Sequence, residues 1–295
     1  AAPVIMCVQN YDDLGRQGIT AARDYASNIL ESCKPNAIIF TYGDNDTYPV
    51  WYAQEVEGIR RDVRVINLSL IAVDWYIAAQ RRKINESAPV KMSIPQEKYR
   101  GQLRNQVFYF NPEDPEGKLN NDREMSAQSW LKFIGEDHPL SSGSGREIET
   151  FMPSRNVTLE VSPEAALKTG MFTPGDSSVL TKIPINLAGK TYLTKDELAV
   201  IDIITSNIQD RPIYFSVTCQ GDKLMGLDDY TEMDGMALRI VPFKSQSERN
   251  MYIYGAGKMD YDYTYDVIMN KYKWGNFDKQ QLFVDKSYGP SVQAF

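Results

Sequence analysis

The stretch AIIFTYGDNDTYPVWYAQEVEGIRRDVRVINLSL, residues 37–70, contains the pattern that decides the fold. A short apolar run at 37–42 is followed by a polar turn, a helical segment that ends near Gly58, and a second apolar run at 63–70. In the helical segment, Pro49 is expected in the first turn, where its missing N–H is not needed. Short apolar runs separated by one helix are typical of parallel strands buried between helices. The stretch therefore predicts a strand–helix–strand unit of a parallel sheet.

Patterns on both sides of this stretch extend the unit. The apolar run at 3–9 predicts a buried strand before it, and residues 20–32 and 74–84 predict helices capped by Thr20 and Asp74. Strand and helix alternate with short connections, which predicts a three-stranded parallel sheet core within residues 3–84.

The rest of the chain adds to this core. Strands are expected at 106–111, 156–161, 177–187, 213–218 and 236–243, and helices at 126–136, 194–208 and 262–275. Thr194 and Glu197 form a capping box, and the strand after that helix is expected to return to the first sheet.

The expected fold class is α/β, a Rossmann-like three-layer α/β/α arrangement with a mainly parallel sheet and additional β-rich insertions. One domain is expected over 1–295. It consists of a core at 1–84 plus 195–243, an irregular insertion at about 85–194, and a C-terminal helical segment at 260–295.

Composition limits the classes of function. The 295 residues carry a net charge of −7, which would repel a nucleic acid, so no nucleic-acid partner is expected. No apolar run approaches the ~20 residues that span a bilayer. The spacing of Cys7, Cys33 and Cys219 fits neither a disulfide framework nor a four-thiolate zinc site, so buried thiols are expected. The one histidine, His138, excludes a multi-histidine metal site within this chain and leaves carboxylates for any chemistry.

Polar loops follow the three expected strands. Their candidate ligand-binding residues are Asn10, Asp12 and Asp13, then Asp44, Asn45, Asp46 and Thr47, and then Asn67, Ser69 and Asp74. Because the carboxyl ends of parallel strands open on one edge, these side chains are expected to converge in one crevice. Oxygen ligands of this kind suit Mg²⁺, Mn²⁺, Ca²⁺ or the hydroxyls of a sugar.

No cofactor is expected, and a divalent cation at Asp44 and Asp46 is the alternative. Asp46 and Thr47 also belong to the residue types that cap helices, so a capping network without a ligand explains the same pattern.

Residues 43–70 closely resemble a segment of a bacterial family of large membrane proteins, which is grouped with the protein O-mannosyltransferases of the GT-C type. The similar positions are Gly43 to Thr47, Pro49, Trp51, Tyr52, Gln54, Glu55, Glu57, Gly58, Arg60, Asp62 to Arg64, Asn67 to Ser69, and Asp74 to Tyr76. RPIYF at 211–215, GL at 226–227 and YDVIMNKYKWG at 265–275 resemble later motifs of that family.

The resemblance implies that this chain is a soluble, extracytoplasmic region, periplasmic in a bacterium, tethered by an N-terminal membrane domain outside this sequence. The family's catalytic acidic residue and lipid-phosphate sugar donor are expected in that membrane domain, which would be the partner of this one. Catalytic residues within this chain are therefore not assigned. The chain departs from an Asp-His-Asp type stretch of the family, because it has Asp13-Leu14-Gly15 instead, and this weakens the case for a metal site.

Three functions follow as alternatives. The first is an accessory domain that binds an acceptor protein or glycan and packs on the membrane domain. The second is a self-contained, metal-dependent sugar-transferring enzyme that uses Asp44 and Asp46. The third is a purely structural or interaction domain in which the polar loops only cap helices.

Overall fold

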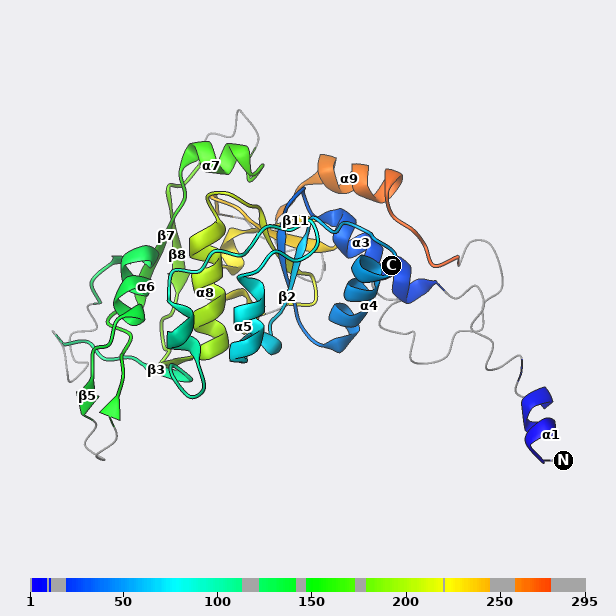
Figure 1. The fold of residues 1–295 in the computed structure, drawn as a ribbon. Coiled ribbons are helices and arrows are strands. Elements are labelled where there is room, and N and C mark those ends of the chain that lie inside the picture. The colour runs from blue at the N-terminus through cyan, green and yellow to red at the C-terminus, as the bar shows by residue number, and fades with distance from the viewer. Residues whose placement is uncertain are drawn as a thin grey trace.

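The computed structural model describes residues 2–9, 11, 20–112, 122–141, 147–172, 179–219, 221–244 and 258–276 (Figure 1). Its α-helices are α1 (Ala2–Gln9), α3 (Ala21–Ser32), α4 (Asp44–Glu55), α5 (Asp74–Gln80), α6 (Ala127–Gly135), α7 (Pro163–Lys168), α8 (Lys195–Asn207) and α9 (Tyr261–Asn270). Short 3-10 helices are η1 (Leu70–Ala72), η2 (Gln96–Tyr99), η3 (Gly221–Leu224) and η4 (Asp228–Tyr230). The α/β class predicted from the sequence is confirmed.

The largest sheet combines parallel and antiparallel strands. Its order is β13 (Lys258–Met259), β11 (Thr231–Asp234), β12 (Ala237–Ile240), β10 (Ile213–Ser216), β1 (Ile38–Thr41) and β2 (Arg64–Asn67). β1 lies between β2 and β10 and is parallel to both, whereas β12 runs antiparallel to β10 and β11. The expected return of the 213–218 strand to the first sheet is confirmed.

The two faces of this sheet bury different helices. Alternate residues of a strand point to opposite faces. Accordingly, Ile39 belongs to an apolar cluster with α3 and α4, whereas Ile38 and Phe40 belong to a cluster with α5 and α8. Figure 1 shows α3 and α4 on one side of β2 and α5 and α8 on the other. The polar turns after β1 and β2 therefore leave the sheet at one edge, between helices of both layers.

The prediction of a strand at 3–9 is wrong. These residues lie in α1, which has no place in the sheet, so the described part of residues 3–84 contributes two parallel strands and not three. The third parallel strand is β10, on the other side of β1. The physical reason is that a short, continuous apolar run has no periodicity that separates a buried strand from a helix.

The start of α4 also differs from the expectation. The helix begins at Asp44, so Pro49 lies inside it and not in its first turn. Gly43, with φ of +82°, precedes the helix, and no side chain caps it. That φ lies in the left-handed region, where a glycine is favoured over residues with a Cβ.

Of the helix caps predicted at Thr194, Thr20 and Asp74, the one at Thr194 is present as predicted. The capping box of Thr194 and Glu197 on α8 is confirmed. Thr20 does not cap α3 with its side chain but donates a hydrogen bond of 2.8 Å to Asp24 Oδ2. Asp74 is the first residue of α5, and its Oδ1 accepts from the backbone N–H of Trp75 at 2.7 Å.

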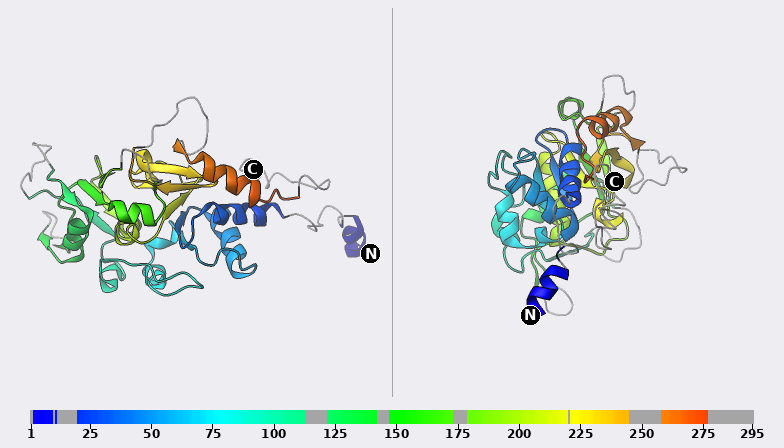
Figure 2. Two further views of the ribbon diagram at one scale, coloured as in Figure 1. Left: turned by 90° about the horizontal axis from the view of Figure 1, so that it is seen from above. Right: turned by 90° about the vertical axis from the view of Figure 1, so that its right-hand side faces the viewer.

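Residues 85–194 form a second region beside α8. Its strands are β3 (Gln106–Phe108), β4 (Met125–Ser126), β5 (Leu140–Ser141), β6 (Glu147–Ile148), β7 (Asn156–Glu160), β8 (Lys182–Asn186) and β9 (Tyr192–Thr194). They make three small sheets, β3-β9, β4-β7-β8 and β5-β6. Figure 2 shows this region at one end of an elongated molecule and α1 at the other.

Buried groups on α8 connect this region to the core. The apolar residues of β7, β8 and α6 belong to the same cluster as α8. The buried carboxylate of Asp202 on α8 accepts hydrogen bonds from the backbone N–H of Ser93 at 2.6 Å and of Ile94 at 3.1 Å, and from the Tyr99 hydroxyl at 3.0 Å. Because a buried carboxylate needs such donors, the 88–99 segment is held firmly against the helix.

Candidate functional site at the carboxyl edge of the parallel strands

Thr47 and Asn67 meet at the carboxyl edge, as the sequence led us to expect, but both are buried. The Asn67 side-chain amide donates to Thr47 Oγ1 at 2.7 Å, and the Thr41 and Thr47 hydroxyls lie 2.8 Å apart. Asn67 Oδ1 accepts from the backbone N–H groups of Ser69 at 2.8 Å and Leu70 at 2.9 Å. These buried hydrogen bonds therefore hold the turns after β1 and β2 in place.

Asp46 is also buried, with 3% of its surface exposed. Its Oδ1 accepts from the Tyr25 hydroxyl at 2.8 Å, and its Oδ2 accepts from the Ser216 hydroxyl at 3.0 Å and from the Thr218 hydroxyl. The carboxylate therefore joins α3, α4 and the end of β10, and both of its oxygens already accept hydrogen bonds.

The other predicted site residues lie in different surroundings. Asp44, Asn45 and Ser69 are exposed, and Asp74 is half-buried. Asp74 Oδ2 accepts from the backbone N–H of Gly101 at 3.1 Å, and this bond, with the one from Trp75, lowers the pKa of the carboxyl. Asn10, Asp12 and Asp13 lie outside the described residues.

A cleft of about 210 Å³ opens beside these turns. It is lined by Tyr42, Leu68, Ser69, Asp196, Glu197, Val200, Lys223 and Met225. Of the predicted site residues, Ser69 lines it. Tyr42, Leu68 and Ser69 come from the turns after β1 and β2, whereas the other lining residues come from the first turns of α8 and from the segment after β10. No local sequence pattern connects these two distant segments with residues 42–69.

The cleft combines an apolar base with a charged rim. Leu68, Val200 and Met225 are buried, whereas Tyr42 is exposed, and Lys223 Nζ lies 5.1 Å from the centre of the Tyr42 ring. Glu197 is held in place because its Oε2 accepts from the backbone N–H of Thr194 at 3.0 Å and its Oε1 accepts from Lys190. An apolar surface beside a few fixed polar groups is the usual composition of a small-ligand site.

A wider groove of about 800 Å³ runs along the free edge of β8 and includes Pro184 and Gly226. Pro184 has no N–H, so a further strand could not form a complete ladder along this edge. The groove also carries ion pairs of its own, Arg155 with Asp122 at 3.1 Å and Lys244 with Asp229 at 3.5 Å. Despite its size, the groove is therefore a poor site for an extended peptide that would pair with β8 as an additional strand.

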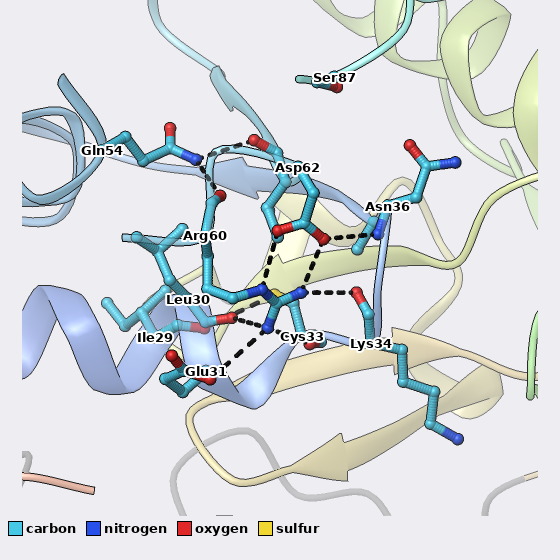
Figure 3. Close-up of polar contacts among 12 residues, drawn as sticks. Ile29, Leu30, Glu31, Cys33, Lys34, Asn36, Gln54, Arg60, Asp62 and Ser87 are labelled. Atoms are coloured by element: carbon cyan, nitrogen blue, oxygen red, sulfur yellow. Dashed lines mark hydrogen bonds and ion pairs between the residues drawn. The ribbon is translucent and has the colours of Figure 1, made fainter. Parts of the chain in front are cut away.

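The opposite, amino edge of the sheet contains many of the positions that resemble the bacterial family. Arg60 donates to the carbonyls of Leu30 at 3.1 Å and Cys33 at 2.8 Å, at the end of α3, and to Asp62 Oδ1 at 2.9 Å (Figure 3). Gln54 Nε2 donates to the Arg60 carbonyl at 2.8 Å. A cation that donates to the last carbonyls of a helix satisfies acceptors that have no partner within the helix.

Two buried arginines at the same edge are also held by carbonyls. Arg64 donates to the carbonyls of Ser87 at 3.0 Å and Ala88 at 2.8 Å, and Arg211 donates to the carbonyl of Asn36 at 2.7 Å. Burial lowers the pKa of each to about 10, and for Arg211 the charge of Arg64 adds to the effect. The segment 43–70, which resembles the bacterial family, therefore contains residues that hold the fold together as well as residues that lie near the cleft.

Among the described residues, Glu232, Asp234 and Asp260 are the group of carboxylates close enough to hold a metal ion. Their oxygens suit a hard cation. However, the Arg239 guanidinium contacts Glu232 at 2.8 Å, Asp234 at 3.0 Å and Asp260 at 3.3 Å. The arginine supplies the positive charge of this cluster, which explains the cluster as a buried ion-pair network.

The thiols and the histidine have structural surroundings. Cys33 and Cys219 are buried, and burial raises the pKa of both thiols, whereas Cys7 on α1 is exposed, contrary to the expectation. The ring of His138 stacks on Phe133 with centroids 3.8 Å apart.

No helix among the described residues is both long and apolar enough to cross a membrane. Searches of the curated proteins and of the solved structures found no match to this chain. A family model does match, over residues 22–262. This range includes the residues that line the cleft, the turns around it, and Arg60, Arg64 and Arg211 at the amino edge. The chain belongs to the family described as TMEM260-associated domain 2.

Proposed function

We propose that this domain is the extracytoplasmic part of a membrane-bound, protein O-mannosyltransferase-like glycosyltransferase, and that it binds the acceptor protein or glycan at the carboxyl edge. The family match supports a link to a glycosyltransferase-like membrane protein. On this proposal the domain packs on a membrane domain that this sequence does not contain, and its sheet with α3 and α4 on one face and α5 and α8 on the other is a Rossmann-like core.

The observation that carries the proposal is the cleft beside Tyr42. A sugar ring has apolar faces and a rim of hydroxyls. The exposed Tyr42 ring can stack against such a face, and Ser69 and Asp196 offer hydrogen-bonding groups at the rim. Volume favours a small ligand, because about 210 Å³ is less than the roughly 300–1,000 Å³ of drug-sized pockets.

The geometry at Asp46 favours binding over chemistry in this domain. A metal-dependent transferase that used Asp44 and Asp46 would need both carboxylates free to reach one ion. Asp46 is buried with both oxygens accepting from hydroxyls, whereas Asp44 is exposed on the first turn of α4. We therefore propose that no cofactor is needed here and that the isolated domain transfers no sugar.

The test is a titration of the isotope-labelled domain with three probes, followed by NMR. The probes are a mannosylated threonine peptide, the same peptide without sugar, and methyl α-mannoside. We expect the signals of Tyr42 and Ser69 to shift with the glycopeptide. Tyr42→Ala should weaken binding by roughly 3–10-fold, the scale of one aromatic contact.

Tyr52→Ala is the matched control, because Tyr52 is 48% exposed, close to the 45% of Tyr42, but does not line the cleft. Shifts with the bare peptide alone would identify a protein acceptor as the ligand. Shifts that ignore Tyr42→Ala, or no shift with any probe, would refute binding of a sugar or acceptor at this cleft.

A further inference from the structure

A second cleft, of about 390 Å³, lies at the opposite end of α8 from the cleft beside Tyr42. Helices α6 and α8 contact each other there (Figure 1). The lining residues come from α8, from α6 and from the segment that Asp202 holds against α8, and they are Lys91, Met92, Ser93, Gln128, Thr205 and Ser206. The volume is within the roughly 300–1,000 Å³ of small-ligand pockets. The two clefts share no lining residue, so they can be tested separately.

Thr205 has an unusual environment in this cleft. Its side chain is buried, with 5% exposed, but its hydroxyl has no hydrogen-bond partner among the described residues. Buried polar groups of native proteins are nearly always hydrogen-bonded, because an unsatisfied one costs free energy. Threonine in a helix has two favoured χ1 positions, so the hydroxyl can turn to meet a group that enters the cleft. A ligand would therefore satisfy a group that the fold leaves unsatisfied.

Two further hydroxyls at this cleft can only accept a hydrogen bond from a ligand. Those of Ser93 and Ser206 both donate to Asp202 Oδ1, at 2.8 Å and 3.1 Å. A hydroxyl has one proton, so what these two groups offer a ligand is the lone pairs of their oxygens. With Thr205, the cleft presents three hydroxyl oxygens, which is the number of N–H donors on an ammonium group.

The charges around the cleft also favour a cation. Asp202, directly bonded to two of the hydroxyls, is 0% exposed and forms no ion pair within the described part of the chain. Burial raises the pKa of its carboxyl, but the five groups that donate to its oxygens favour the ionised form. Thr205 and Ser206 lie in the last turn of α8, where the helix dipole is negative. The ammonium of Lys91, at the rim, is paired with Asp210.

We infer that this cleft binds an alkylammonium group, whose N–H groups donate to the hydroxyls of Ser93, Thr205 and Ser206. Met92, half-buried against the core, provides an apolar wall for the methylene groups next to the nitrogen. A carboxylate or phosphate has no proton to donate and would meet the charge of Asp202. A lysine side chain of a polypeptide and a free amine both carry the group that fits. The inference does not depend on the cleft beside Tyr42, so each can fail without the other.

The experiment is an NMR titration of the isotope-labelled, whole 295-residue chain at pH 7 and constant ionic strength. The probes are n-butylamine, N-acetyl-lysine methylamide, the same lysine compound acetylated on its Nε, and n-butyrate. We expect the backbone signals of Ser93, Gln128 and Thr205 to shift with n-butylamine and not with the acetylated compound or n-butyrate. Equal shifts with the lysine compound would indicate a polypeptide lysine as the natural ligand, and shifts with n-butylamine alone would indicate a free amine.

Thr205→Val tests the contact, because valine keeps the shape of threonine and removes the hydroxyl. We expect the affinity for n-butylamine to fall by roughly tenfold, the scale of one hydrogen bond to a charged group, and the melting temperature to stay or rise. Thr150→Val is the matched control, since Thr150 is 2% exposed with an unpartnered hydroxyl in the described structure but lies outside the cleft. It should bind like the wild type.

Four results would overturn the inference. They are no shift with either amine, equal shifts with the acetylated compound, shifts with n-butyrate in place of the amines, and an affinity that Thr205→Val leaves unchanged or that Thr150→Val lowers as much.

Discussion

The side-chain amide of Asn67, at the end of β2, donates a hydrogen bond of 2.7 Å to the hydroxyl of Thr47 on α4. This bond connects two polar loops that the sequence identified separately, and it lies beneath the surface. The two loops therefore converge, but the side chains that meet are buried and stabilise the turns. Of the predicted site residues, Ser69 lines the cleft.

Replacing Asn67 should loosen both turns. Asn67→Ala removes one of the hydrogen bonds that Thr47 Oγ1 accepts and leaves the N–H groups of Ser69 and Leu70 without their acceptor. We expect the free energy of unfolding to fall by roughly 1–3 kcal/mol, the cost of unsatisfied buried groups. Urea denaturation measures it. Asn45→Ala, at an exposed position in the first turn of α4, is the control and should stay within about 0.5 kcal/mol of the wild type.

Asp46 and Asp44 should behave differently although they share one motif. Asp46→Asn turns one acceptor oxygen into a donor that faces the Ser216 and Thr218 hydroxyls or the Tyr25 hydroxyl, so a loss of roughly 1–3 kcal/mol is expected. Asp44→Asn, exposed, should change stability little. Thermal melts of both variants decide the matter. If Asp46→Asn kept the melting temperature but removed a metal-dependent activity, the enzyme alternative would replace our proposal.

Arg60 should not tolerate lysine. Its guanidinium donates to the carbonyls of Leu30, Cys33 and Lys34 and to Asp62, a fork that a single ammonium group cannot reproduce. We expect Arg60→Lys to lower the free energy of unfolding by roughly 1–3 kcal/mol. The neighbouring Arg61→Lys, whose side chain contacts Asn85 at the surface, serves as the comparison in the same denaturation series. An equal, small effect of both changes would contradict the role given to Arg60.

The partner of Arg60 gives a pH dependence with a defined sign. Burial alone would raise the pKa of Asp62, but hydrogen bonds from Arg60 and from the backbone N–H of Asn36 outweigh it and lower the pKa below the ordinary 3.8. A lowered carboxyl pKa contributes stability above the unfolded value, and that stability is lost as the pH falls through the folded value.

Melting curves of the wild type and Asp62→Asn between pH 3 and pH 7 test this sign. The deficit of the variant should be largest near neutral pH and should shrink as the pH falls below about 4. Asp44→Asn, run alongside, should show a small difference that does not follow this course. A deficit of Asp62→Asn that grew toward acid would reverse the sign we assign.

Gly226 should be more sensitive to a methyl group than Gly189. Both have positive φ, +72° and +79°, so both strain when replaced by alanine. A Cβ on Gly226 would lie 2.6 Å from the Asn186 carbonyl oxygen, whereas one on Gly189 would meet nothing within 4 Å. Gly226→Ala should therefore lose more, by roughly 1–3 kcal/mol beyond Gly189→Ala. Equal melting temperatures of the two variants would show that the turn can move away from β8.

Local patterns predicted the elements whose signals are local. The capping box of α8 and the strand–helix–strand unit around α4 are of this kind. The run at 3–9 failed because a short, continuous apolar run fits a helix as well as a strand.

Long-range features of the site could not be predicted from spacing. Lys223 and Met225 reach the cleft from the segment after β10, and Asp196 reaches it from α8. The burial of Asp46 depends on Tyr25, Ser216 and Thr218, two of which lie about 170 residues away. A pattern of residue types identifies the polar side chains of a turn. Whether such a side chain is exposed to a ligand or buried in a hydrogen bond depends on residues that are distant in the sequence.

The position of β1 determines when the domain can fold. Ile38 pairs with Arg64 on one side and with Ile213 on the other, so the central strand has one early and one late neighbour. Closing so long a loop is slow, because its entropy is lost before the strand contacts form. During synthesis the first half of the chain must wait, with Ile38 and Phe40 lacking part of their cover, until residue 216 has emerged. A ribosome stalled before Ile213 should therefore present a nascent chain that chaperones bind and proteases cut, whereas one stalled after the completed sheet should not.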